Sequence, residues 1–155
     1  MKQASEQKPD ARGLRIAILR SAFNGGVVDG LLAGARAALE EMGASAVMIE
    51  EVPGAFELPL ASRAAALSGR FDAIVALGAV IRGETDHYEH IAREAASGLA
   101  AVARETGVPV GFGVLTVSDE AQARARSAPG SANKGAEAAR AAVAMVHVLR
   151  RLEGR

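Results

Sequence analysis

The sequence predicts a three-layer α/β domain, in which helices cover both faces of an open four-stranded parallel sheet. The first observation is a set of short aliphatic runs without clean polar alternation, which is typical of strands buried on both faces. These runs are residues 14–19, 46–52, 73–77 and 108–115. The second observation is a set of alanine-rich stretches with helical spacing. These stretches are residues 27–42, 58–67, 88–106 and 136–152.

The order of these segments also predicts the topology. Because strands and helices alternate along the chain, right-handed crossovers place the helices on both faces of one sheet. Gly43 and Gly69 occupy positions suited to helix C-caps, and Gly107 with Pro109 ends the third helix. No linker or internal repeat interrupts the pattern, so we expect a single domain over residues 14–155.

Composition argues against several classes of function. A chain of 155 residues can bury a core without disulfide or metal staples. It contains no cysteine, and therefore no thiol nucleophile or thiolate ligand. The 18 basic and 18 acidic residues balance, which disfavours nucleic acid or a membrane as a partner. The polar residues 1–13 are predicted to be a flexible arm, not a signal peptide, so we expect a cytoplasmic protein.

Phe23 is the first candidate for ligand binding, because ligands of open α/β sheets bind outside the carboxyl ends of the strands. A phenylalanine near a strand end usually belongs to the core. Phe23, however, lies between a strand and a turn, next to Asn24 and two glycines. Its ring is therefore suited to stacking on a planar ligand, an arrangement worth about 0.5–1.5 kcal/mol beyond burial.

The segment after the second strand, residues 53–57, is the next candidate. Glu57 suits the first turn of a helix, where the dipole favours an acid. It could equally accept hydrogen bonds from ligand hydroxyls. In that case backbone groups would form the walls of the pocket. The residues concerned are Ala55, Phe56, Ala79, Val80 and Ile81.

The loop after the third strand combines an anion-binding pattern with a titratable group. Glu84, Thr85 and Asp86 precede a helix that begins near His87. The free N–H groups and dipole at such a helix start can hold a phosphate, although the same residue types suit plain N-capping. A lone histidine there is more often structural. Beside a phosphate, His87 becomes a candidate proton donor or acceptor, because histidine titrates near neutrality.

Two further sets of residues are considered as a metal site and as an anion-binding site. His87 and His90 are three residues apart on a helix, but no convincing third ligand accompanies them, so we expect no metal. Arg126 and Lys134 lie in a segment, residues 124–135, that is predicted to be a loop. They are either solvated surface residues or an anion clamp, to which an arginine is suited by bidentate phosphate contact.

Five segments of the chain, in order and in register, resemble the lumazine synthase family over residues 14–152. The matching segments are Phe23-Asn24, PGAFELP at 53–59, LGAVIRGETDHYE at 77–89, FGVLT at 112–116, and Gln122-Ala123 with Arg126 leading to NKG at 133–135. Each segment is modest by itself, but five in register are highly specific. The resemblance implies a flavodoxin-like fold, in agreement with the predicted sheet.

The resemblance also implies a function, that of a transferase in riboflavin biosynthesis. The expected reaction condenses 5-amino-6-(D-ribitylamino)uracil with 3,4-dihydroxy-2-butanone 4-phosphate. The products are 6,7-dimethyl-8-ribityllumazine, phosphate and water, and no cofactor or metal is implied. This reaction is the penultimate step of the pathway.

Roles for individual residues follow from the same resemblance. His87 would be the proton-transfer residue, and Phe23 would stack on the pyrimidine ring. The remaining substrate-binding residues would be Ala55, Phe56 and Glu57 at the ribityl chain and ring edge, Ala79, Val80 and Ile81 at the uracil, Glu84, Thr85 and Arg126 at the phosphate, Phe112 closing the pocket, and Lys134 near the pyrimidine edge.

The resemblance further implies a homo-oligomer with active sites between subunits. Phe112, Arg126 and Lys134 would come from a neighbouring subunit of a pentamer, and pentamers in this family often build an icosahedral shell. Riboflavin synthase is a candidate partner. The segment after Arg126 has no insertion relative to shell-forming members, although residues 127–131 differ in composition. Ala22 replaces an arginine that often precedes Phe-Asn, which affects a local contact and not the reaction.

Two alternative functions use the same fold. A non-catalytic flavin- or lumazine-binding protein would keep the pocket, but it would have no use for a phosphate clamp of the kind that His87, Arg126 and Lys134 suggest. A flavodoxin-like electron carrier would need a hydroxyl-rich phosphate cradle after the first strand. Residues 21–26 do not provide that cradle. The sequence therefore favours the enzyme.

Overall fold

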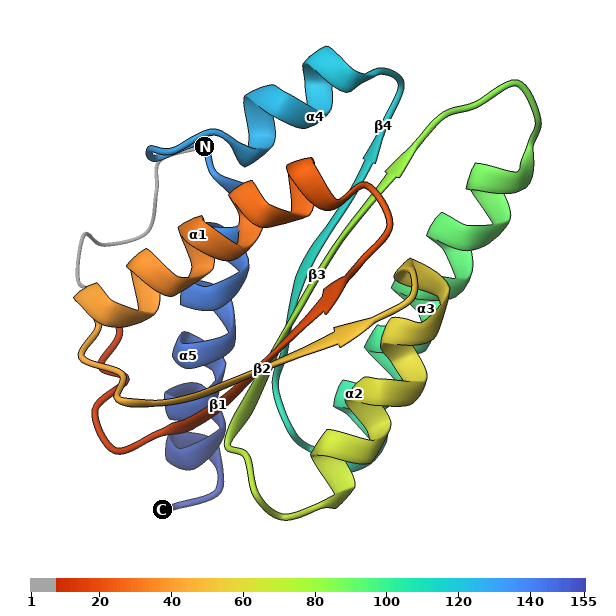
Figure 1. Cartoon of the computed structure of the whole chain (residues 1–155). Coiled ribbons are helices and arrows are strands. Elements are labelled where there is room, and N and C mark those ends of the chain that lie inside the picture. The colour runs from red at the N-terminus through yellow and green to blue at the C-terminus, as the bar shows by residue number, and fades with distance from the viewer. Residues whose placement is uncertain (1–7) are drawn as a thin grey trace.

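The computed structural model describes residues 8–155 and confirms the predicted parallel sheet (Figure 1). The sheet has the order β2-β1-β3-β4, and every neighbouring pair is parallel. The strands are β1 (Arg15–Ser21), β2 (Ala46–Val52), β3 (Ala73–Ile81) and β4 (Val110–Val117). Their carboxyl ends meet at one edge of the sheet, where the prediction places the ligand.

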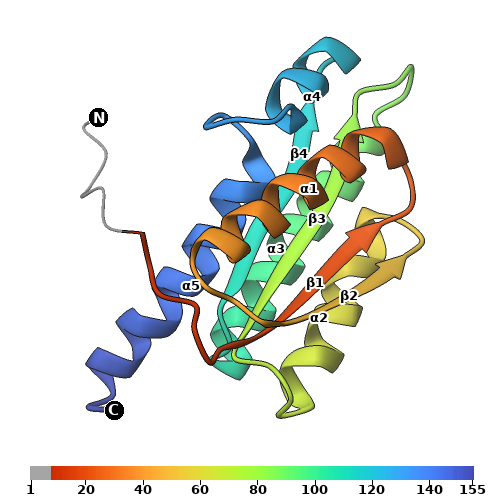
Figure 2. The ribbon, with the colours of Figure 1, turned by 60° about the vertical axis from the view of Figure 1, so that its left-hand side comes forward.

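Helices cover both faces of the sheet, as predicted. Figures 1 and 2 together show α1 and α5 on one side of the sheet and α2 and α3 on the other. The helices are α1 (Gly25–Glu41), α2 (Leu58–Leu67), α3 (His87–Thr106), α4 (Glu120–Ser127) and α5 (Lys134–Leu152), and a short 3-10 helix, η1 (Ala55–Glu57), precedes α2. Within residues 8–155, no helix is both long and apolar enough to cross a membrane.

The core consists of two aliphatic clusters, one on each face of the sheet. Ile16 and Ile18 point into the cluster beneath α1 and α5, while Ala17 and Leu19 point into the cluster beneath α2 and α3. This alternation follows from the two-residue period of a strand. The prediction that all four strands are buried on both faces is wrong for the two edge strands, β2 and β4. Glu50 and Glu51 are exposed in β2, and Phe112 and Thr116 are exposed in β4.

Two predicted boundaries also need correction. The third strand does not end at residue 77 but continues to Ile81. Residues 124–135 are not a loop throughout, because α4 extends to Ser127. Asp119 caps that helix by accepting a 2.8 Å hydrogen bond from the Gln122 N–H, and the Gln122 side chain accepts one from the Ser118 N–H.

The helix ends predicted from glycines are confirmed, since Gly43, Gly69 and Gly107 have φ values of 86°, 72° and 73° next to helix ends. Of the predicted arm, residues 1–7 lie outside the described residues. Within the remainder, Ala11 is buried and its N–H donates to the Met42 carbonyl at 2.8 Å. The flexibility of the arm stays a prediction.

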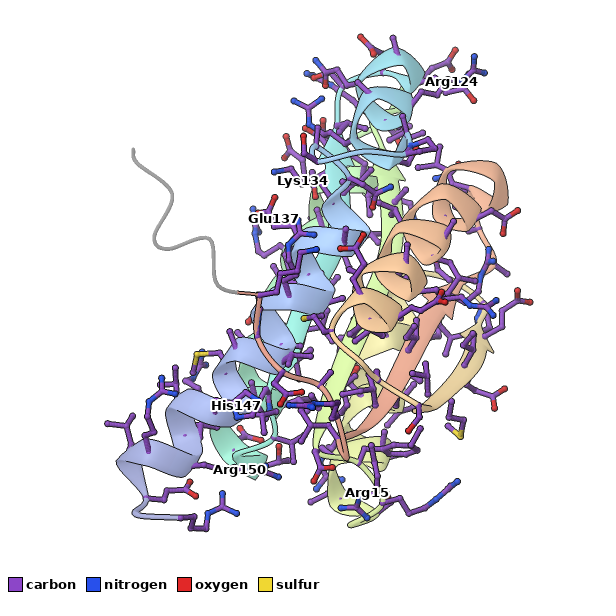
Figure 3. All side chains as sticks on the ribbon, turned by 90° about the vertical axis from the view of Figure 1, so that its left-hand side faces the viewer. Arg15, Arg124, Lys134, Glu137, His147 and Arg150 are labelled. Atoms are coloured by element: carbon purple, nitrogen blue, oxygen red, sulfur yellow. The ribbon has the colours of Figure 1, made fainter. Side chains whose placement is uncertain are left out.

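An ion pair joins the amino ends of β1 and β3, at the end of the sheet opposite the candidate ligand site. The Arg15 backbone N–H donates to Asp72 at 2.7 Å, and its guanidinium donates to both carboxylate oxygens at 3.3 Å. Burial raises the pKa of Asp72, but the hydrogen bonds from Arg15 outweigh this effect and lower the pKa. Figure 3 shows Arg15 and Arg150 at this end of the sheet. The amino ends of β1 and β3 are thereby held together.

Buried Asn133 joins the three helices on the α1 face. It is 1% exposed, and its Nδ2 donates to the Gly30, Ser127 and Ala128 carbonyls at 3.0–3.1 Å. Its Oδ1 accepts a hydrogen bond from the Ala136 N–H and so caps α5. A Cβ at Gly34 would lie 2.0 Å from the same oxygen, so α1 approaches this close only because a glycine is there. The end of α4 and the start of α5 are therefore fixed relative to α1.

The close α1–α5 contact makes Gly135 sensitive to the addition of one methyl group. A Cβ there would lie 2.0 Å from the Leu31 carbonyl oxygen, a backbone atom that cannot rotate away. We expect Gly135→Ala to lower the free energy of unfolding by at least about 1–3 kcal/mol. Urea denaturation followed by circular dichroism measures the change.

Gly26→Ala is the matched control. Gly26 is likewise the second residue of its helix, but a Cβ there would meet nothing within 4 Å. We expect the free energy of unfolding of the Gly26→Ala variant to equal that of the wild type or to exceed it by up to about 1 kcal/mol, because alanine favours helix more than glycine does. Equal stabilities of the two variants would contradict the packing argument.

Candidate functional site

A cavity of about 470 Å³ opens at the carboxyl edge of the sheet. It lies among the turn after β1, the segment between β2 and α2, the end of β3 and the first turns of α3. The lining residues are Phe23, Pro53, Gly54, Ala55, Phe56, Glu57, Ala79, Val80, Ile81, Gly83, Thr85, His87, Tyr88 and Ile91. Nine of the predicted site residues are in this set, which makes the cavity the candidate site.

Phe23 presents its ring to the cavity and does not belong to the core. The residue is 70% exposed, because the chain leaves the sheet at this point. Its backbone is nevertheless held in place, since the Phe23 N–H donates to the Pro53 carbonyl at 3.2 Å and the Ala22 N–H donates to the Val52 carbonyl at 2.8 Å. An exposed ring on an anchored backbone is suited to stacking on a planar ligand.

The end of β3 supplies backbone groups to the cavity. Pairing with β1 ends at Leu77, whereas pairing with β4 continues to Ile81. The last residues of β3 therefore have a strand neighbour on one side alone. Ala79 and Val80 are buried and Ile81 is partly buried, so the backbone edge of this strand end is enclosed and lines the cavity. Enclosed amide groups of this kind can recognise the polar edge of a ring.

The segment after β2 forms the opposite wall. In η1, Ala55 is buried, while the Phe56 ring is 55% exposed and lines the cavity. Glu57 occupies the N-cap position of α2, but its side chain makes no capping hydrogen bond. Its carboxylate therefore remains free to accept hydrogen bonds from ligand hydroxyls.

The start of α3 completes the cavity. Gly83, Thr85 and His87 line it, and Glu84 lies in the same exposed loop without being a lining residue. Asp86 occupies the N-cap position, but its side chain makes no capping hydrogen bond. The N–H groups of the first turn therefore lack a side-chain cap, and together with the helix dipole they favour an anion. His87, the first residue of α3, stands beside this point.

Two lining residues, Tyr88 and Ile91, were missed at the level of sequence. Both are partly buried on α3. Ile91 is four residues after His87, so helical spacing places the two on one face and could have identified it. The ring of Tyr88 lies 5.8 Å from the Arg82 guanidinium, a cation–π distance that links the loop before α3 to the helix.

Three predicted site residues lie away from the cavity. Phe112, in β4, is 49% exposed at the edge of the sheet. Arg126 donates to the Gln122 carbonyl within α4, and Lys134 pairs with Glu137 within α5 at 2.9 Å (Figure 3). The α4 and α5 helices pack on the α1 side of the sheet, so within one chain Arg126 and Lys134 do not meet the α3 start.

Two other candidate features are weaker. A second cavity, of about 360 Å³, lies between the start of α1 and α4 and contains none of the predicted site residues. His87 and His90 start α3, whereas His147 is on α5, on the other face of the sheet (Figure 3). Within residues 8–155, no three His, Cys, Asp or Glu side chains converge as a metal site.

Comparison with known proteins matches the chain to a family model and to curated relatives. A family model described as 6,7-dimethyl-8-ribityllumazine synthase matches residues 13–150. A curated relative with the same description, from Leifsonia xyli subsp. xyli, is 51% identical over 150 residues. The alignment covers 96% of this chain and 94% of the relative.

The start of α3 is expected to bind inorganic phosphate. Thr85→Val keeps the shape of the side chain but removes the hydroxyl, and neutral hydrogen bonds contribute about 0.5–1.5 kcal/mol each. We expect the dissociation constant of phosphate, measured by calorimetry, to rise by about 2–10-fold. Thr106→Val is the control, since the Thr106 hydroxyl donates to the Val102 carbonyl at the far end of α3. Equal affinities in the wild type and Thr85→Val would contradict this role.

Proposed function

The chain belongs to the 6,7-dimethyl-8-ribityllumazine synthase family, and from this membership we propose how its cavity carries out the reaction. The protein is a transferase that condenses 5-amino-6-(D-ribitylamino)uracil with 3,4-dihydroxy-2-butanone 4-phosphate. It forms 6,7-dimethyl-8-ribityllumazine with loss of one phosphate and two water molecules, in riboflavin biosynthesis. Nothing in the comparisons favours the alternative of a non-catalytic flavin-binding protein.

One observation carries the assignment of roles: a single cavity brings together an exposed aromatic ring, the open end of a strand and an uncapped helix start. Phe23 stacks on the pyrimidine ring. Backbone groups of residues 79–81 bind the uracil edge, and Glu57, with the backbone of residues 55–56, binds the ribityl chain. In this proposal, each element is matched to the part of the ligand whose chemistry it can recognise.

The second substrate is bound at the start of α3. Its phosphate is held by Glu84 and Thr85 through the free N–H groups of the loop and first helical turn, with Thr85 adding a hydroxyl donor. The butanone chain then extends from the phosphate toward the ring bound by Phe23. The 5-amino group and the ketone are thus held next to each other, and orientation of this kind supplies on the order of 7–11 kcal/mol at best.

His87 is the proton-transfer residue. The amine attacks the ketone, and a first water leaves as the imine forms. Elimination of the phosphate then gives an enol that becomes a ketone, and the ribityl-bearing nitrogen closes the ring on this ketone with loss of a second water. Each of these steps moves a proton between nitrogen, carbon or oxygen atoms. His87 lines the cavity as the first residue of α3, beside the proposed phosphate-binding turn. A positioned acid–base group typically contributes about 10²–10⁴-fold.

A neighbouring subunit completes the site. Phe112, Arg126 and Lys134 do not line the cavity of their own chain, and all three are at least partly exposed. In a pentamer, the α4–α5 face of one subunit would bring Arg126 to the phosphate of the next, with Phe112 closing the pocket and Lys134 near the pyrimidine. Shells of such pentamers, a cytoplasmic location and association with riboflavin synthase are part of the same proposal.

The direct test is to mix the pure protein with both substrates and to follow the absorbance of the lumazine product. The expected result is acceleration well above the uncatalysed condensation. Absence of any acceleration by folded protein would refute the proposed function. Light scattering on the same sample distinguishes a pentamer from a shell.

His87→Ala is expected to slow turnover without abolishing it. The loss of kcat should not exceed about 10²–10⁴-fold, because binding and orientation of the two substrates remain. Steady-state kinetics measure kcat, and both KM values should change little. His90→Ala is the control, since His90 is on the same helix but does not line the cavity. A complete loss of activity with intact substrate binding would contradict this division of roles.

Mixed oligomers test whether sites are shared between subunits. His87→Ala and Arg126→Ala each damage one half of a shared site, so each homo-oligomer should have low activity. Co-refolding equal amounts should restore about a quarter of the sites, because one neighbour pair in four combines an intact His87 with an intact Arg126. Activity that remains at the mean of the two parent variants would show that each site lies within one subunit.

A further inference from the structure

Asn24 has an unusual backbone conformation directly beside the candidate site. Its φ of 58° and ψ of 42° are left-handed, and within residues 8–155 it is the one non-glycine residue with a positive φ. Asparagine tolerates this region better than most residues do, but it remains unfavourable for any side chain. Such a conformation persists only where surrounding contacts hold it.

The side chain of Asn24 also departs from its usual role. Asn24 occupies the N-cap position of α1, where asparagine normally accepts a hydrogen bond from the first turn, yet it makes no capping bond. Instead its Nδ2 donates to the Ala79 carbonyl at 2.9 Å. This contact begins where β1–β3 pairing has stopped, two residues beyond Leu77. The side-chain amide thus continues the connection between β1 and β3 after the strands separate.

This contact fixes the residue that precedes Asn24. The Phe23 N–H donates to the Pro53 carbonyl, and the Phe23 carbonyl accepts a 3.3 Å hydrogen bond from the Ser21 hydroxyl. The Asn24 amide adds the tie to β3. Because the Phe23 ring is 70% exposed, packing does little to hold it, and its position depends on the backbone on either side.

Asn24 does not itself line the candidate site. It lines the second cavity, on the other side of the turn, while Phe23 and Ala79 line the site. Asn24 is therefore not positioned to contact the substrate directly. Asn24 instead connects two parts of the site without lining it. These are Phe23, whose ring would stack on the pyrimidine, and the end of β3, whose backbone would bind the edge of the pyrimidine.

We propose that Asn24 is a positioning residue that sets the spacing between the Phe23 ring and the end of β3, and thereby the affinity for the ribitylaminouracil. The inference rests on the proposed function, which places the pyrimidine between these two elements. The butanone phosphate binds at the start of α3, which Asn24 does not contact. Loss of the Asn24–Ala79 hydrogen bond should therefore weaken the binding of the ribitylaminouracil and leave the binding of the butanone phosphate unchanged.

Two variants separate backbone strain from the hydrogen bond. Asn24→Gly accepts the left-handed conformation without strain but lacks the amide. Asn24→Asp keeps the size of the side chain but places a carboxylate, which cannot donate, against the Ala79 carbonyl. Ser68→Ala is the control, since it removes a side-chain hydrogen bond, to the Ala65 carbonyl, at the opposite edge of the sheet.

The measurements are the KM of each substrate, kcat, and the calorimetric dissociation constant of the ribitylaminouracil alone. For both Asn24 variants we expect the KM and the dissociation constant of the ribitylaminouracil to rise by about 3–10-fold, the effect of one lost hydrogen bond. The KM of the butanone phosphate should stay within about twofold, and the melting temperature of Asn24→Gly near that of the wild type. Ser68→Ala should leave both KM values unchanged.

Two outcomes would overturn the inference. One is unchanged affinity for the ribitylaminouracil in both variants. The other is an equal rise in both KM values, which would indicate a general structural role. If Asn24→Gly does not fold, Asn24→Asp decides between these outcomes. A wild type that binds the ribitylaminouracil but forms no lumazine would contradict the proposed function alone, and the calorimetric comparison would still decide the role of Asn24.

Discussion

The candidate site depends on a difference in pairing on the two sides of β3. The strand pairs with β1 as far as Leu77 and with β4 as far as Ile81. If β1 were longer, its backbone would occupy the open edge of residues 79–81, and the cavity would be filled by the sheet itself. The chain instead turns away at residues 22–24, so that Phe23 and the end of β3 face a common space. A difference of a few paired residues thus converts the end of a sheet into a binding site.

Around this space, helix starts remain without the side-chain caps that are usual in proteins. Asp86 and Glu57 both occupy N-cap positions and make no capping bond. Away from the site, Asp119 and Asn133 do cap α4 and α5. Uncapped N–H groups cost stability unless water or a ligand satisfies them. The uncapped starts of α2 and α3 therefore leave N–H groups at the cavity available to a ligand. The start of α1, where Asn24 makes no capping bond either, lies beside them.

The sequence predicted the fold and most of the site because both follow from local patterns. Aliphatic runs and helical spacing defined the layers, and the rule on strand ends located Phe23, residues 53–57 and His87. What it missed depended on neighbours distant in the chain. The third strand was ended too early because Gly78 weakens a strand pattern, yet a Cβ at Gly78 would lie 3.2 Å from the Leu58 side chain and 3.3 Å from the Ser21 hydroxyl. The exposure of β2 likewise depends on its place at the sheet edge, which no local pattern encodes.

The monomer leaves aromatic rings exposed both at the cavity and away from it. Phe23, Phe56 and Phe112 are each about half exposed or more, although aromatic rings are scarce in this chain. Exposed apolar side chains beside a cavity are typical of surfaces that meet another chain or a ligand. At the same time Asn133 holds the start of α5, and through it Lys134, in a fixed place relative to α4. The interior packing of one subunit would then determine how accurately it completes the site of the next, so stability and catalysis would be linked through the same buried amide.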